Sequence, residues 1–90
     1  MEKHTFEITE TFEVTFPHFR RYEFFFFKVL CPEKEIFIKY LDKEYGQLAT
    51  IEYRDIVKLS TFTAGSYEIT EDEFNETFQR AFNIIINHKN

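Results

Sequence analysis

The chain has 90 residues, of which 20% are aromatic and 30% charged, and its formal net charge is −5. This length predicts a single domain over residues 1–90 with a small core, and the acidic balance disfavours nonspecific binding to nucleic acid or anionic lipid. No apolar run approaches the ~20 residues that span a bilayer, so we expect no membrane partner.

The N-terminal residues and the cysteine content indicate the cellular compartment of the protein, and the composition indicates its source. Its first residues are polar and alternating, without the continuous apolar stretch of a signal peptide, and the single cysteine, Cys31, cannot form an intramolecular disulfide. Both features favour a cytoplasmic protein. The chain is rich in Phe, Ile, Lys, Asn and Tyr, which have AT-rich codons, and this indicates a low-GC bacterium or its phage.

The first predicted strand covers residues 4–16. Apolar residues alternate there with Thr and Glu over a dozen positions, the pattern of a strand with one buried face and one wet face. Glu10 interrupts the apolar face and predicts a bulge or the point where the strand passes the sheet edge.

The second predicted strand, residues 20–31, contains four consecutive Phe residues, Phe24 to Phe27. Successive side chains of a strand point to opposite faces of the sheet. Phe24 and Phe26 are therefore expected on one face, and Phe25 and Phe27 on the other. Such a strand needs apolar cover on both sides.

Further strands are predicted at residues 35–41, 47–53 and 56–63. Pro32 occupies the second position of a tight turn before the first of them, and the loop 42–46 ends on Gly46, which readily adopts a positive φ. Consecutive antiparallel strands joined by short turns usually pair with their sequence neighbours. We therefore expect a meander with the strand order 1-2-3-4-5.

A C-terminal helix is predicted over residues 71–87. Thr70 and Glu73 fit a capping box, in which the Thr hydroxyl accepts from the Glu73 amide and the Glu side chain returns to the Thr70 amide. Ile69 and Phe74 are placed as the accompanying hydrophobic staple. Apolar residues then recur at helical spacing, so one stripe of the helix is expected to face the sheet.

These elements predict an α+β fold, an antiparallel β-meander of four to five strands with the C-terminal helix packed on one face. One helix cannot cover both faces, and a bare apolar patch of several hundred Å² is unusual for a monomer. We therefore expect the uncovered face to contact another protein. The expected interaction residues are Tyr22, Phe25, Phe27, Val29, Phe37 and Lys39, together with Arg20 and Arg21.

Motifs for catalysis or metal binding are not found. His4, His18 and His88 have none of the spacings that build metal sites, and no phosphate loop or nucleophile motif occurs. We expect no enzyme activity, no cofactor and no metal. The alternative site for catalysis is His18 with Arg20 and Arg21, although arginines at such a strand end more often stack on aromatic rings.

The leading functional hypothesis is a small protein-interaction module that forms a homodimer or binds a protein partner through its aromatic sheet face. An accessory or inhibitor protein of a phage or mobile element would fit the acidic composition. Two alternatives also use the aromatic sheet: single-stranded nucleic acid stacked on exposed rings, and a small apolar ligand in a cavity at the interface of sheet and helix. The net charge of −5 and the missing RNP-type spacing oppose the nucleic-acid reading.

Overall fold

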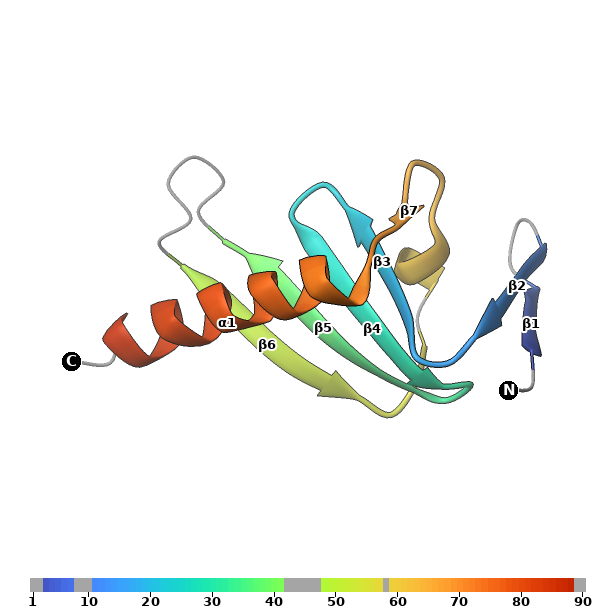
Figure 1. Cartoon of the computed structure of the whole chain (residues 1–90), viewed down its shortest axis with the longest axis horizontal. Coiled ribbons are helices and arrows are strands. Elements are labelled where there is room, and N and C mark those ends of the chain that lie inside the picture. The colour runs from blue at the N-terminus through green and yellow to red at the C-terminus, as the bar shows by residue number, and fades with distance from the viewer. Residues whose placement is uncertain (1–2, 8–10, 42–47, 58, 89–90) are drawn as a thin grey trace.

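The computed structural model describes residues 3–7, 11–41, 48–57 and 59–88 (Figure 1). The structure is elongated, with extents of 42 × 24 × 22 Å. Its elements are β1 (Lys3–Glu7), β2 (Thr11–Thr15), β3 (His18–Tyr22), β4 (Phe25–Cys31), β5 (Lys34–Tyr40), β6 (Ala49–Arg54), the 3₁₀ helix η1 (Leu59–Phe62), β7 (Tyr67–Glu68) and α1 (Glu71–His88).

Five strands form one antiparallel sheet in the order β6-β5-β4-β3-β7, while β1 and β2 form a separate two-stranded sheet. The four strands β3 to β6 follow one another as a meander, and the short β7 returns to pair with β3. With α1 packed against the larger sheet, the predicted α+β class is confirmed. The predicted order 1-2-3-4-5 is wrong, because β1 and β2 leave the main sheet and β7 joins its far edge.

The single strand predicted over residues 4–16 is wrong, since this segment is the β1–β2 hairpin with Phe6 opposite Phe12. The alternation of apolar and polar residues indicates which side chains share a face. It can continue unchanged through a turn, so a hairpin and one long strand can show the same pattern. The predicted bulge at Glu10 lies outside the described residues.

The strand predicted over residues 20–31 is likewise two strands, β3 and β4, joined by a turn at Glu23 and Phe24. Glu23 has a φ of 52°, in the left-handed region that Gly or Asn usually occupies, so no turn residue marked the reversal in the sequence. The alternation of the Phe block nevertheless holds within β4. Phe26 packs under α1, whereas Phe25 and Phe27 face the other way.

The remaining strand predictions divide into two groups. Segments 35–41 and 47–53 correspond to β5 and β6, and the turn at Pro32 is confirmed by the pairing of Cys31 with Lys34. The strand predicted at 56–63 is wrong, because its C-terminal half is η1. The predicted loop at 42–46 lies outside the described residues.

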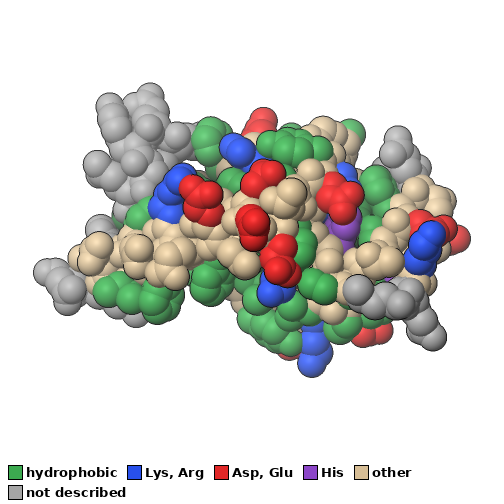
Figure 2. All heavy atoms as spheres, in the orientation of Figure 1, with side chains coloured by type: hydrophobic (Ala, Val, Ile, Leu, Met, Phe, Trp, Pro, Cys, Tyr) green, Lys and Arg blue, Asp and Glu red, His purple; other side chains and the backbone are tan. Residues whose placement is uncertain are grey.

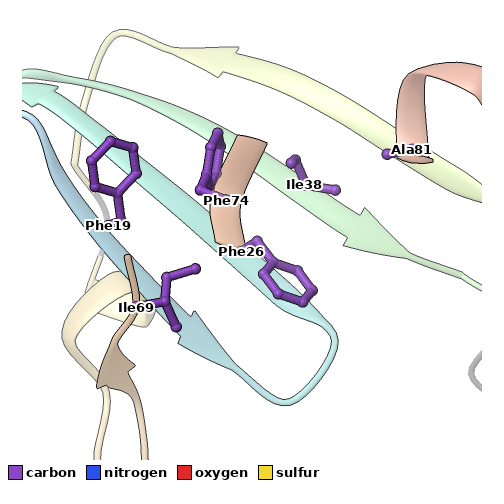
Figure 3. Packing of buried hydrophobic residues seen from close by; sticks show 6 residues of the cluster. All are labelled: Phe19, Phe26, Ile38, Ile69, Phe74 and Ala81. Carbon is purple, nitrogen blue, oxygen red and sulfur yellow. The ribbon is translucent and has the colours of Figure 1, made fainter. Parts of the chain in front are cut away.

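Helix α1, predicted over residues 71–87, lies across β4, β5 and β6 (Figure 1). The cap is confirmed: the Glu73 amide donates to the Thr70 hydroxyl at 3.1 Å, and that hydroxyl, not the Thr70 amide, meets the Glu73 carboxylate at 3.4 Å. Acidic side chains gather over the first turns of α1 (Figure 2), where the helix dipole favours negative charge. The helix-side core consists of Phe19, Phe26, Ile38, Ile69, Phe74 and Ala81 (Figure 3).

A second cluster covers part of the opposite sheet face. Phe62 of η1 stacks at 4.9 Å on Phe6 and at 4.9 Å on Phe12, and these rings pack over Val29 of the sheet. Near η1 the cover that we expected from a partner is therefore supplied by the chain itself. The N-terminal hairpin and η1 are the missing cover.

Replacement of Thr70 by Ala should lower the free energy of unfolding by about 1 kcal/mol, because the Glu73 amide loses its acceptor. Chemical denaturation checks this value. Thr5→Ala, at an exposed position of β1, is the matched control and should change the free energy by less than about 0.5 kcal/mol. Equal effects of the two substitutions would contradict the cap.

Candidate functional site

The predicted interaction residues divide between the two faces of the sheet. Residues paired across antiparallel strands share a face, and the row Arg20, Phe27, Phe37 runs across β3, β4 and β5. Tyr22, Phe25 and Lys39 form the next row on that face, and Val29 the row before. Seven of the eight predicted residues therefore share the face opposite α1. Arg21 is the exception.

Arg21 lies on the helix side of the sheet. Its guanidinium carbon is 4.8 Å from the ring centroid of Phe26, and its Nε donates to the Glu23 carbonyl at 2.9 Å. Arg20 stacks on the opposite side, 5.3 Å from each of the Phe12 and Phe62 rings. The interpretation of both arginines as ring-stacking residues is confirmed.

A row of nearly parallel rings follows the part of the opposite face that η1 leaves open. Tyr22 stacks on Phe25 at 6.2 Å, Phe25 on Phe37 at 5.8 Å, and Phe37 on Phe27 at 5.2 Å. These separations lie within the range in which offset aromatic pairs attract each other. The four rings thus form a continuous and preorganised apolar surface.

These rings enclose a hollow of about 210 Å³, lined by Tyr22, Phe25, Phe27, Phe37 and Thr63. Phe27 and Phe37 are only 1% and 7% exposed and are its most deeply buried lining residues, whereas Tyr22, Phe25 and Thr63 are half-buried. We call this feature the aromatic hollow. Its apolar lining is concave and can be reached from the surface.

The wall of the aromatic hollow at Tyr22 depends on Gly65. This residue has a φ of 93°, and a Cβ atom at its position would lie 3.2 Å from the Tyr22 ring. Both the conformation and the close approach favour Gly. The turn that carries Thr63 can therefore rest directly against Tyr22.

Two cations border the row of rings. The Lys39 ammonium lies 5.9 Å from the Phe25 centroid, and the Arg54 guanidinium carbon lies 3.8 Å from that of Phe37. Arg54 also forms an ion pair with Glu35 at 3.2 Å and lies 3.6 Å from Glu52. Arg54 is thus held in place, and Lys39 is the more adaptable charge of the two.

Glu35 is a fully buried carboxylate on the same face. Its Oε1 accepts from the Thr61 hydroxyl at 2.6 Å, and its Oε2 accepts from Arg54 at 3.2 Å. The carboxylate therefore joins β5, β6 and η1 at one point. Burial of an unpaired charge is costly, and these hydrogen bonds and the ion pair offset that cost for Glu35.

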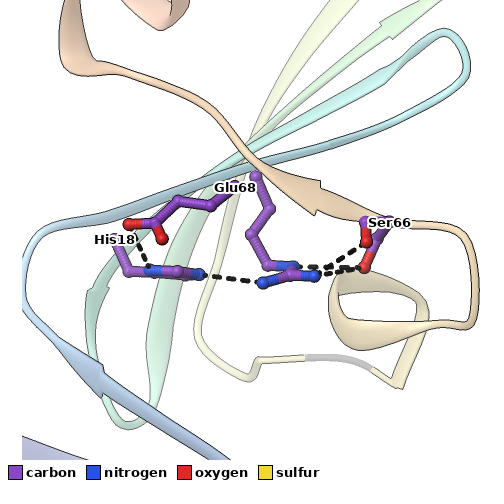
Figure 4. A network of polar contacts seen from close by, with 4 residues as sticks. His18, Ser66 and Glu68 are labelled. Atoms are coloured by element: carbon purple, nitrogen blue, oxygen red, sulfur yellow. Dashed lines mark hydrogen bonds and ion pairs between the residues drawn. The ribbon is translucent and has the colours of Figure 1, made fainter.

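His18 and Arg20 form a polar network beside η1 (Figure 4). Arg20 donates to the hydroxyl and carbonyl of Ser66 at 2.9 Å each, and its Nη1 lies 3.5 Å from Nε2 of His18. Glu68 Oε2 lies 3.8 Å from Nδ1 of the same ring. Burial lowers the pKa of His18, an effect that Glu68 opposes and Arg20 reinforces. Because Arg21 lies on the other face, the alternative catalytic group of His18 with both arginines is not assembled.

Sequence reasoning missed several residues of this face. Thr63 carried no signal, since it fell inside a wrongly predicted strand. Glu35 did carry one, because it lies two residues before Phe37 on the same face of β5, which the sequence predicts to be buried. A charge at such a position indicates a buried partner, which proved to be Arg54 of the next strand.

Within the described parts of the chain, no group of three or more metal-ligating side chains comes together. The one α-helix found there is too polar for a membrane-crossing helix. No protein-family model, curated protein or solved structure matches this chain.

Acidification should destabilise the fold through His18. Its pKa is lowered in the folded state, so the unfolded chain, with a pKa near 6.5, takes up the proton first as the pH falls. The free energy of unfolding should therefore fall as the pH drops below about 6.5. Denaturation of wild type and His18→Gln at several pH values checks this, and an identical pH slope in both would contradict it.

Removal of the Arg54 charge should have a large effect. Arg54→Met keeps most of the apolar stem but leaves the Glu35 carboxylate without its cation, and breaking such a pair costs about 3 to 5 kcal/mol. The double variant Arg54→Met, Glu35→Met should recover much of this loss, because no buried charge remains. Thermal unfolding measures both, and equal destabilisation by the single and double changes would contradict the pairing.

Proposed function

We propose that this chain is a non-enzymatic protein-interaction module that binds a partner protein by receiving one of its apolar side chains in the aromatic hollow. The observation that carries the proposal is the row of stacked rings at Tyr22, Phe25, Phe37 and Phe27, in which Phe37 and Phe27 are buried while Tyr22 and Phe25 stay accessible, although η1 and the N-terminal hairpin cover part of the face. Aromatic residues are enriched at the centres of protein interfaces, where preformed pockets receive the partner side chains that contribute most of the binding energy.

The size of the hollow supports a side chain as its occupant. Pockets for drug-sized ligands commonly enclose about 300 to 1,000 Å³. The aromatic hollow encloses about 210 Å³ and lies open at the surface between Tyr22 and Thr63. A single aliphatic or aromatic side chain, presented by a folded partner or a peptide, matches this volume better than a free ligand does.

The distribution of cations supports a protein partner over single-stranded nucleic acid. Lys28 lies over the Phe19 ring and Arg21 over Phe26, both on the helix side. Arg20 is occupied by Ser66. Lys39 alone of these four residues borders the accessible rings. A strand-binding surface would need a line of cations beside its stacking rings.

The buried state of His18 supports a non-enzymatic role. Its ring stacks on Phe62 at 5.7 Å and lies between Glu68 and Arg20, so it helps to hold η1 and β7 against the sheet. A general base must instead reach the proton that it abstracts.

Selection of a displayed random peptide library on the immobilised protein tests this function. We expect binders that share an aromatic or large aliphatic residue flanked by acidic residues, which would pair with Lys39. Phe25→Ser should weaken these peptides by at least about 30-fold, the affinity equivalent of the ~2 kcal/mol of an interface hot spot.

Tyr67→Ser is the matched control, because it removes a half-exposed ring of β7 that does not line the hollow. The selected peptides should bind this variant as they bind the wild type. Peptides that bind Phe25→Ser unchanged, or a selection without any apolar preference, would overturn the proposal.

A further inference from the structure

Strand β6 ends the main sheet on one side. Among the described strands it pairs only with β5. Leu41 donates its amide to the Leu48 carbonyl at 2.9 Å, and hydrogen-bonded pairs recur at every second residue of an antiparallel ladder. The amides and carbonyls of Thr50, Glu52 and Arg54 therefore face β5, and those of Ala49, Ile51 and Tyr53 face away from the sheet.

This edge carries few of the features that usually prevent strand pairing. β6 is six residues long, contains no Pro or Lys, and keeps a continuous register with β5. Its central charge, Glu52, points to the face opposite α1, while the backbone groups of Ala49, Ile51 and Tyr53 remain presented outward. An edge of this kind is a template for another strand.

Helix α1 continues past β6 (Figure 1). Ala81 is its last fully buried residue, and the seven residues from there to His88 extend about 10 Å, roughly two strand spacings. We call this part the helix overhang. Phe82, 45% exposed, stacks at 6.4 Å on Phe78, and apolar side chains gather along the overhang (Figure 2).

The open edge and the overhang lie on the same side of the molecule. Among the described residues, the edge has unpaired backbone groups there, and the overhang has no strand of its own chain beneath it. A strand added beside β6 would extend the sheet beneath the overhang. Its helix-side residues should then be apolar, and on β6 itself these are Ala49, Ile51 and Tyr53. Tyr53 is 57% exposed, because it lies at the end of β6 that α1 of its own chain does not reach.

We propose that two copies of this chain pair antiparallel through their β6 edges about a two-fold axis at Ile51, with each helix overhang covering Tyr53 of the second copy. This register lets both Ile51 residues exchange their outward backbone bonds and sets Tyr53 opposite the small Ala49. Such pairing is self-complementary, as a two-fold interface must be.

The charges favour the same register. Glu52 of one copy lies opposite Thr50 of the other, and Thr50 is flanked on β5 by Lys39. Each acidic side chain thus has a cation one strand further on. A register centred on Glu52 would instead set two carboxylates opposite each other, which is unfavourable. The dimer leaves the aromatic hollow open, so it does not depend on the proposed function.

Sedimentation or light scattering over a range of concentrations gives the first test. We expect the mass to rise from that of one chain, 11.0 kDa, to twice that value. Phe82→Lys should shift this transition to at least tenfold higher concentration, whereas Asn75→Lys, which adds the same charge to an exposed helix position away from the overhang, should not. A wild type that stays monomeric overturns the proposal.

Comparing Tyr53→Pro with Tyr53→Thr distinguishes the contribution of the β6 backbone to dimerisation from that of the Tyr53 ring. Both lose the Tyr53 ring and its side-chain hydrogen bond to Lys34, but only Pro also removes the outward amide, and neither removes a backbone bond to β5. Pro should therefore abolish the dimer and Thr should weaken it less. Unchanged dimerisation in the Pro variant contradicts pairing through β6.

A covalent trap tests the register without relying on a destabilising change. In a Cys31→Ser background, Ile51→Cys should form an intermolecular disulfide on mild oxidation, since directly opposed residues of a hydrogen-bonded pair lie ~5.5 Å apart at Cα. Thr50→Cys is the control and should not, because it faces Glu52. The reverse result overturns the register, and peptide binding to the aromatic hollow should survive in the trapped dimer.

Discussion

The buried carboxylate of Glu35 is the constraint on which the covered half of the sheet depends. It is fully buried on β5, where β6 supplies Arg54 and η1 supplies Thr61 as hydrogen-bond donors to it. The placement of η1 in turn puts Phe62 over Val29, and Phe62 is the ring on which the N-terminal hairpin docks. One charge thus links the edge strand and the 3₁₀ helix to the hairpin, which is far from both in the sequence.

The two faces of the sheet are covered by layers of different composition. On one face a single helix supplies an almost wholly apolar core. On the other, rings, arginines and a carboxylate are mixed, with Arg54 between Phe37 and Glu35 and with Arg20 over the Phe12 and Phe62 rings. This mixed layer stops at Thr63, and beyond it the rings of Tyr22 and Phe25 remain accessible. The boundary between covered and accessible apolar surface therefore lies where η1 ends.

Features of this fold that depend on neighbouring residues could be predicted from the sequence, whereas features that depend on contacts between distant residues could not. The helix cap at Thr70 and the alternation of the Phe block are local, and both could be predicted. The reversal at Glu23 could not, because no Gly or Asn marks it and strand formers continue on either side. Seven of the eight residues expected to form an interaction surface share one face, because alternation continues across paired strands. Its partial cover was missed because it depends on Glu35 meeting Arg54 and Thr61, contacts made across 19 and 26 positions of the chain.

The meander β3 to β6 has a consequence for the order of events during folding. Its hairpins join neighbours in sequence, so their contacts close short loops and form quickly, whereas both covers arrive from the two ends of the chain. Between these steps the Phe-rich strand β4 exposes rings on both of its faces to water and to other chains. The covers therefore protect as well as stabilise, and a chain slowed at either end would be the one most prone to aggregate.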